Sequence, residues 1–92
     1  MKFKFMPSIN LPYKKQCYIW SVCKNFESQD EKTKAKIAYL CMSIGEEYAP
    51  YLFELLTKDR STVEIALRVP CDESTIKRKR KMFYEEFSKK NT

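Results

Sequence analysis

The 92-residue chain is long enough for one domain and leaves little room for a second. Hydrophobic residues make up 43% of it, which excludes a disordered chain, while one glycine and four prolines supply too few turn residues for a multi-stranded β fold. The formal net charge is +6, with both ends basic around a mildly acidic middle. Because each neutralised phosphate releases a condensed counterion, basic ends favour a polyanionic partner. We therefore expect residues 1–92 to form a single small all-α domain of four to five helices.

The N-terminal quarter predicts an arm followed by a helix. Residues 1–11 begin with alternating polar and apolar side chains at residues 2–5 and then meet Pro7, a pattern typical of a short extended arm or one edge strand. Pro12 suits the first position of a helix, where its missing N–H costs nothing. The first helix is predicted from Pro12 to Phe26, with Gln16 among the polar residues of its outer face. The aromatic residues of this segment are predicted to be core or interface: Tyr13, Tyr18, Trp20 and Phe26.

The middle of the chain predicts two further helices. Ser28 and Glu31 match a capping box, after which apolar residues recur at three- and four-residue steps to about Ile44. Gly45 is expected to end this helix in a left-handed conformation. A third helix is predicted from Glu46 or Pro50 to Thr57, so that residues 12–57 form a helical platform.

Residues 58–88 predict a helix-turn-helix, followed by a tail at residues 89–92. Ser61 or Thr62 can cap its first helix, which runs to a turn at Pro70 and Cys71, and Asp72 is the predicted N-cap of its second helix. The inward face of this last helix is predicted to contain Ile76, Met82 or Phe83, and Phe87.

Two short helices joined by a few residues must cross steeply, which requires a small residue at the contact and apolar anchors on both helices. Ala66 is the small residue, and the anchors are Ile65, Val69 and Ile76. The second helix of such a unit enters the DNA major groove with its N-terminal residues facing base edges. The predicted base contacts are Glu73, Ser74, Lys77 and Arg78. The predicted phosphate contacts are Thr62, Thr75, Lys79, Arg80 and Lys81.

Residues 60–87 resemble region 4 of bacterial sigma factors, the helix-turn-helix that reads the −35 promoter element. They are also similar to the C-terminal segment of phage late-gene activators of the ArpU and RinA type. The residues that match the family pattern are 64–66 (Glu-Ile-Ala), 74–76 (Ser-Thr-Ile) and Arg78. It departs from the pattern at Pro70, where the turn usually has glycine, and at Lys79, where many members have an apolar residue. The resemblance implies a sequence-specific transcription regulator from a phage or mobile element, with double-stranded DNA, RNA polymerase or a second copy as partners.

The four cysteines leave three alternatives: a zinc site, disulfides or reduced packing thiols. There is no histidine, and the closest two cysteines, Cys17 and Cys23, are further apart than the paired ligands of structural zinc sites. The N-terminus has no uninterrupted apolar stretch and no small-residue cleavage site, so we expect a cytoplasmic protein with reduced thiols. We expect no cofactor, no metal and no membrane insertion.

Enzymatic activity is not expected, because no histidine, ligand cluster or nucleophile motif accompanies the acidic pairs at residues 46–47 and 85–86. The main alternative is a small protein-binding module that inhibits or redirects a host or phage protein. It would be favoured if Tyr18, Trp20 and Phe26 formed an exposed patch and the basic run at residues 77–81 were occluded. RNA binding is disfavoured because no stacking aromatic pair interleaves with the basic run. Binding to an anionic membrane surface is also disfavoured, because the apolar face of residues 77–90 is weak.

Overall fold

The computed structural model describes residues 3–58, 60–68 and 72–89. Within these ranges five α-helices follow one another: α1 (Tyr13–Lys24), α2 (Glu31–Gly45), α3 (Ala49–Thr57), α4 (Thr62–Ala66) and α5 (Glu73–Lys89). Two short 3₁₀ helices, η1 (Phe26–Ser28) and η2 (Glu46–Tyr48), precede α2 and α3. The described residues contain no strand, so the all-α prediction is confirmed and residues 3–11 do not form the edge strand that was one alternative for them.

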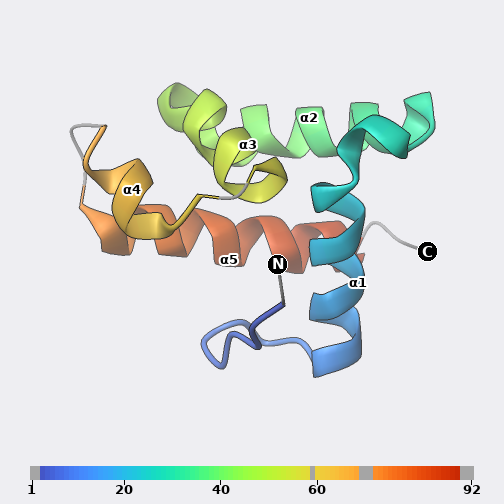
Figure 1. Ribbon diagram of the computed structural model, residues 1–92, viewed down its shortest axis with the longest axis horizontal. Coiled ribbons are helices and arrows are strands. Elements are labelled where there is room, and N and C mark those ends of the chain that lie inside the picture. The colour runs from blue at the N-terminus through green and yellow to red at the C-terminus, as the bar shows by residue number, and fades with distance from the viewer. Residues whose placement is uncertain (1–2, 59, 69–71, 90–92) are drawn as a thin grey trace.

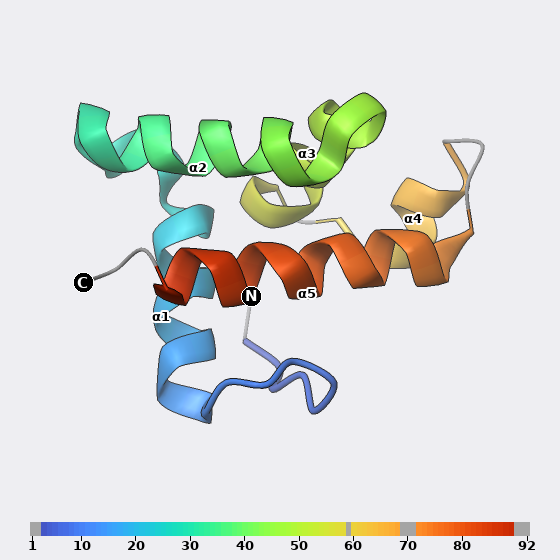
Figure 2. The ribbon, with the colours of Figure 1, turned by 180° about the vertical axis from the view of Figure 1, so that it is seen from behind.

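Helix α5 is the central element of the fold. It contacts each of the other four α-helices, with α2 alongside it and α1 crossing near its C-terminal end (Figure 1). Seen from behind, α5 lies in front, with α2 above it and the N-terminal segment below (Figure 2). Its inward side chains are Ile76, Phe83, Tyr84 and Phe87. The sequence alternative of Met82 or Phe83 is thereby decided, because Phe83 is fully buried and Met82 is exposed.

The N-terminal segment is held against α1 by one buried side chain. The Gln16 amide accepts a hydrogen bond from the Met6 N–H at 2.9 Å. Its Nε2 donates to the carbonyls of Met6, Ile9 and Leu11 at 3.0, 3.3 and 2.9 Å. Gln16 is fully buried and Ile9 belongs to the main core. The prediction of an outward Gln16 is therefore wrong, and residues 3–11 are a packed part of the domain.

The aromatic residues of the first segment divide between core and surface. Trp20 and Phe26 are half-buried against the main core, and Phe26 meets the ring of Phe53 edge-on at 5.0 Å. Tyr13 and Tyr18 are more than half exposed, so the prediction of core or interface is not met by packing within this chain. The predicted helix end at Phe26 is corrected to Lys24, with Phe26 in η1.

Both ends of α2 differ from the sequence prediction. The N-cap is Asp30, whose carboxylate accepts from the Thr33 N–H at 2.9 Å, and not Ser28. At the other end Gly45 is helical, and Glu46 takes the positive φ of 53°. A Cβ on Gly45 would lie 3.4 Å from the Ala49 side chain, at the limit of ordinary van der Waals contact, so Gly45 does not provide the predicted left-handed cap and the packing of α3 does not depend on it.

Helices α3 and α4 begin as the sequence suggests. Pro50 lies in the first turn of α3, where its missing N–H is tolerated. Ser61 and Glu64 form a capping box at the start of α4, with Ser61 Oγ accepting from the Glu64 N–H and the Glu64 carboxylate accepting from the Ser61 N–H, both at 3.1 Å. Helix α4 ends at Ala66 and Leu67 and Arg68 form a turn, so the prediction of a helix that continues to Val69 is wrong at these two positions, while residues 69–71 lie outside the described residues.

Candidate nucleic-acid interface

Helices α4 and α5 pack against α3 around a small apolar cluster of their own. Leu55 of α3, Ile65 of α4 and Ile76 of α5 form it, and the last two are completely buried. The predicted anchors Ile65 and Ile76 therefore meet as expected. Val69, the third predicted anchor, and the turn at Pro70 and Cys71 lie outside the described residues.

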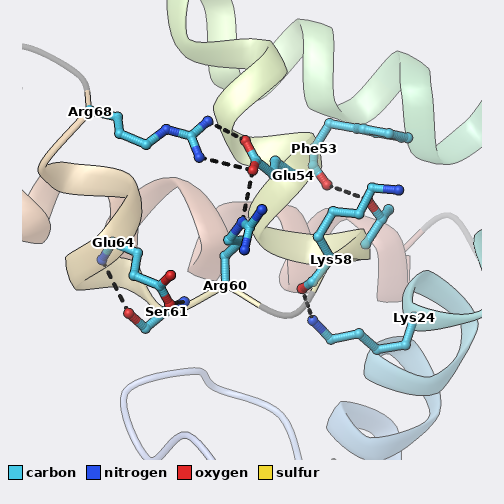
Figure 3. Close-up of polar contacts among 9 residues, drawn as sticks. Lys24, Phe53, Glu54, Lys58, Arg60, Ser61, Glu64 and Arg68 are labelled. Atoms are coloured by element: carbon cyan, nitrogen blue, oxygen red, sulfur yellow. Dashed lines mark hydrogen bonds and ion pairs between the residues drawn. The ribbon is translucent and has the colours of Figure 1, made fainter.

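A single carboxylate fixes both ends of α4 to α3. Glu54 of α3 receives two hydrogen bonds from the Arg68 guanidinium, at 2.6 and 3.0 Å, just after α4 ends. It receives a third from Arg60 Nε, at 3.0 Å, just before α4 begins (Figure 3). These bonds, first from Arg68 and then from Arg60, lower the pKa of Glu54 to about 2. We call this group the Glu54 clamp, and it orients a helix too short to be stable by itself.

A second polar contact joins α4 to α5. The Thr62 hydroxyl donates to the Glu73 carboxylate, and Thr62 itself is buried. Glu73 also lies 3.5 Å from Lys77 one turn along α5. The Thr62 hydrogen bond, and secondarily the charge of Lys77, lower the pKa of Glu73. Thr62 thus acts as a link between the two helices, and its hydroxyl is turned away from solvent.

The start of α5 is capped by Asp72, as predicted. Its carboxylate accepts from the Thr75 N–H at 3.0 Å and from the hydroxyls of Thr75 and Ser74 at 2.8 and 2.9 Å. These bonds, with that of the Thr75 hydroxyl the largest, lower the pKa of Asp72. Ser74 remains exposed, whereas Thr75 is half-buried.

Three basic side chains of α5 reach solvent on its N-terminal half. Lys77 and Arg78 are exposed, and Lys81 is 41% exposed while pairing with Glu85 at 3.2 Å. Arg78 has no ion pair within the part of the chain that the structure describes. Ser74 and Arg78 are one turn apart, so they lie on one face of the helix. The structure therefore brings together four of the predicted contact residues: Ser74, Lys77, Arg78 and Lys81.

The remaining members of the basic run point inward. Lys79 Nζ donates to the Ile44 carbonyl at 3.0 Å and lies 3.5 Å from Glu46, so it caps the C-terminal end of α2. Arg80 is half-buried on the core side of α5. With Thr62 also turned inward, the predicted phosphate contacts at Thr62, Lys79 and Arg80 lack the exposure that such contacts need. Thr75 and Lys81 remain candidate phosphate contacts, because the side chains of both are partly exposed.

The residues that position this surface could not be predicted from the sequence. Glu54, Arg60 and Arg68 are ordinary surface charges in the sequence, and only the packing of α3 on α4 makes them a clamp. The inward position of Lys79 could have been predicted from helical spacing. Lys79 lies three residues after Ile76 and four before Phe83, both fully buried, so it had to approach the inner face of α5.

The described cysteines are reduced, with Cys23 and Cys41 buried and Cys17 half-buried. Burial raises the pKa of both buried thiols to about 12, and the nearby Cys41 adds to the effect on Cys23. No group of three or more metal-ligating side chains occurs within residues 3–58, 60–68 and 72–89. Within these ranges no helix has the length and apolar composition needed to cross a bilayer.

Comparison of the chain with protein-family models, characterised proteins and solved structures gave no significant match.

Proposed function

We propose that this protein is a DNA-binding transcription regulator of phage or mobile-element type that reads the major groove with α5. The observation that supports this most strongly is the outward position of Lys77, Arg78 and Lys81 on the N-terminal half of the helix. Recognition helices contact base edges through that half. The resemblance of residues 60–87 to sigma region 4 supports the same assignment.

Arg78 is the central contact in this proposal. It is exposed, lacks an ion pair among the described residues, and shares a helix face with Ser74. An arginine fork matches the two acceptors of guanine, and a good bidentate pair discriminates by about 1–3 kcal/mol. Lys77 and Lys81 flank it and can reach phosphates after exchanging their carboxylate partners.

Glu73 contributes to the proposal in a changed way. Its carboxylate is held by Thr62 and Lys77, so it first positions α5 on α4. Both contacts involve Oε2, so a role in accepting from a cytosine amine falls to Oε1. We therefore propose Ser74, Lys77, Arg78 and Lys81 as the contact set, with Thr75 at its edge and Glu73 as the support.

The helical platform formed by α1, α2 and α3 would carry the second half of the function. A single recognition helix reads few base pairs, so regulators of this kind commonly bind as dimers or beside RNA polymerase. We propose that the platform provides that contact, and that the protein acts by binding and not by catalysis.

Fluorescence anisotropy with random duplex DNA at several salt concentrations tests the proposal. If three to four phosphates are contacted, the logarithm of the binding constant should fall with the logarithm of salt concentration with a slope of about −3. A Lys77→Ala, Arg78→Ala double variant should lose this binding. The matched control is Lys14→Ala, Lys15→Ala, which removes the same charge from exposed positions on α1. No binding at low salt, or equal loss in both variants, would contradict the proposal.

One observation favours the protein-binding alternative. Tyr39 and Met42 lie one turn apart on α2 and are 63% and 70% exposed. Large apolar side chains exposed together are typical of protein contacts. Sedimentation equilibrium of wild type and Met42→Glu tests whether α2 contacts a second copy of the chain. Self-association that the variant loses would assign α2 to a dimer contact. A monomer in both cases would contradict a dimer through α2.

A further inference from the structure

A cavity of about 590 Å³ lies between the N-terminal segment and the α4–α5 pair, and Lys77 is the one member of the proposed DNA contact set that lines it. Its walls come from residues 3–8, α1, the end of α3, the start of α4 and the inner edge of α5. Figure 2 shows the N-terminal segment passing below α5. The volume is within the range of sites that bind small molecules, which is about 300–1,000 Å³.

The walls of the cavity are rich in basic and aromatic residues. Five cationic residues line it: Lys4, Lys24, Arg60, Lys77 and Arg80. The acidic lining residue is Glu64, whose carboxylate is engaged in the α4 capping box. Four aromatic residues complete the lining: Phe3, Phe5, Trp20 and Tyr84. Such a lining fits a ligand that combines an anionic group with a planar ring.

Not all of these cations are equally available. Arg60 is bound in the Glu54 clamp, Lys24 donates to the Lys58 carbonyl, and Lys77 lies 3.5 Å from Glu73. Lys4 is exposed at the rim. Arg80 differs from all of them, because its Nε is inaccessible to solvent and has no hydrogen-bond partner among the described residues.

A buried guanidinium N–H without an acceptor is costly, and native proteins rarely leave one unsatisfied. Burial also lowers the pKa of Arg80, although the guanidinium keeps its proton at any neutral pH. Phosphate oxygens are acceptors that arginine binds through two parallel N–H groups. The solvent-inaccessible Nε is itself out of a ligand's reach, so a phosphate would bind the part of the Arg80 guanidinium that lines the cavity.

We propose that this cavity binds a nucleoside monophosphate-like ligand, with the phosphate against Arg80 and Lys4 and the ring against the Phe3, Phe5 and Trp20 side. The proposal depends on the cavity and not on DNA binding, so it can fail or succeed independently of the function proposed above.

The test uses the full chain without DNA. Trp20 is the only tryptophan of the chain and lines the cavity, so its fluorescence reports occupancy directly. The probes are the four nucleoside 5′-monophosphates, adenosine and inorganic phosphate, with isothermal titration calorimetry as a second readout. We expect saturable binding of at least one monophosphate, with adenosine and phosphate each binding at least about tenfold more weakly, because each lacks one of the two contacts.

Arg80→Gln is the main variant, and Lys89→Gln is its control at an exposed position of the same helix that does not line the cavity. Arg80→Gln should weaken monophosphate binding by about tenfold or more, and Lys89→Gln by less than about twofold. Lys4→Gln, at an exposed position, keeps the test decisive if Arg80→Gln does not fold, and it should also weaken binding. Absence of binding by all four monophosphates, or equal binding by wild type and both cavity variants, would overturn the proposal. Phosphate binding as tightly as the monophosphates would overturn the ring contact.

Discussion

Replacing Gln16 by alanine removes the hydrogen bonds that hold the N-terminal segment to α1. Its side-chain amide makes one accepted and three donated contacts, and because Nε2 has two hydrogens, one N–H is shared between two carbonyls. The amide itself is completely buried. Its loss would leave the Met6 N–H and the carbonyls of residues 6, 9 and 11 without this partner.

The protein can respond to Gln16→Ala in two ways, and both are costly. If the segment stays in place, three hydrogen bonds at about 1 kcal/mol each are lost. If the segment detaches to rehydrate its backbone, the burial of Ile9 is lost, at about 1.5–3 kcal/mol. We therefore expect a destabilisation of about 2–4 kcal/mol, a large share of the roughly 5–15 kcal/mol by which domains of this kind are stable.

Urea unfolding followed by circular dichroism measures this change. The matched control is Gln29→Ala, whose amide makes two long contacts, at 3.4 and 3.3 Å, to the carbonyls of Val22 and Asn25. The control should cost less than about 1 kcal/mol. If Gln16→Ala unfolds within about 0.5 kcal/mol of wild type, or no worse than the control, the buried amide does not hold the segment as described.

Three further predictions concern stability and reactivity. Glu54→Gln should lower the melting temperature at pH 7 but not at pH 2. A carboxylate with a lowered pKa stabilises the fold above its ordinary pKa of 4.5 and loses that effect as pH falls toward about 2. An equal difference at both pH values in scanning calorimetry would contradict the clamp. In a variant with the other two cysteines replaced by serine, Cys23 and Cys41 should resist Ellman's reagent at pH 8 until urea unfolds the chain, since burial raises their pKa to about 12; rapid reaction of the folded protein would contradict that burial. Arg80→Met should leave the melting temperature of the ligand-free protein unchanged or raise it, because a buried unpaired N–H is removed; a fall of about 10 °C or more would show that Arg80 has a structural partner.

Helix existence followed from the sequence because it depends on local periodicity, whereas helix ends depend on competition between neighbouring residues. Ser28 and Asp30 can both cap a helix, and Asp30 does so because its carboxylate reaches the Thr33 N–H. Gly45 was expected to be a left-handed cap because glycine takes that conformation cheaply, yet Gly45 is helical and Glu46 takes the positive φ.

The candidate surface was predictable only where it depends on helical spacing. Arg78 and Ser74 follow from the buried Ile76 and Phe83, since these anchors place the two residues on the outer side of α5. The inward positions of Thr62 and Gln16 depend on partners 11 and 10 residues away, at Glu73 and Met6. No local pattern contains that information, because it arises only when the helices pack.

The proposed DNA contact of the N-terminal half of α5 can be tested with a single pair of variants. Arg78→Ala and Lys89→Ala each remove one positive charge from an exposed position of the same helix, near its opposite ends. Their affinities should be measured by anisotropy on the tightest duplex selected from a random pool. We expect Arg78→Ala to lower the affinity by about tenfold or more, as for a lost base contact, and Lys89→Ala to lower it by less than about twofold. Equal losses, or failure to select any duplex, would contradict the proposed DNA contact.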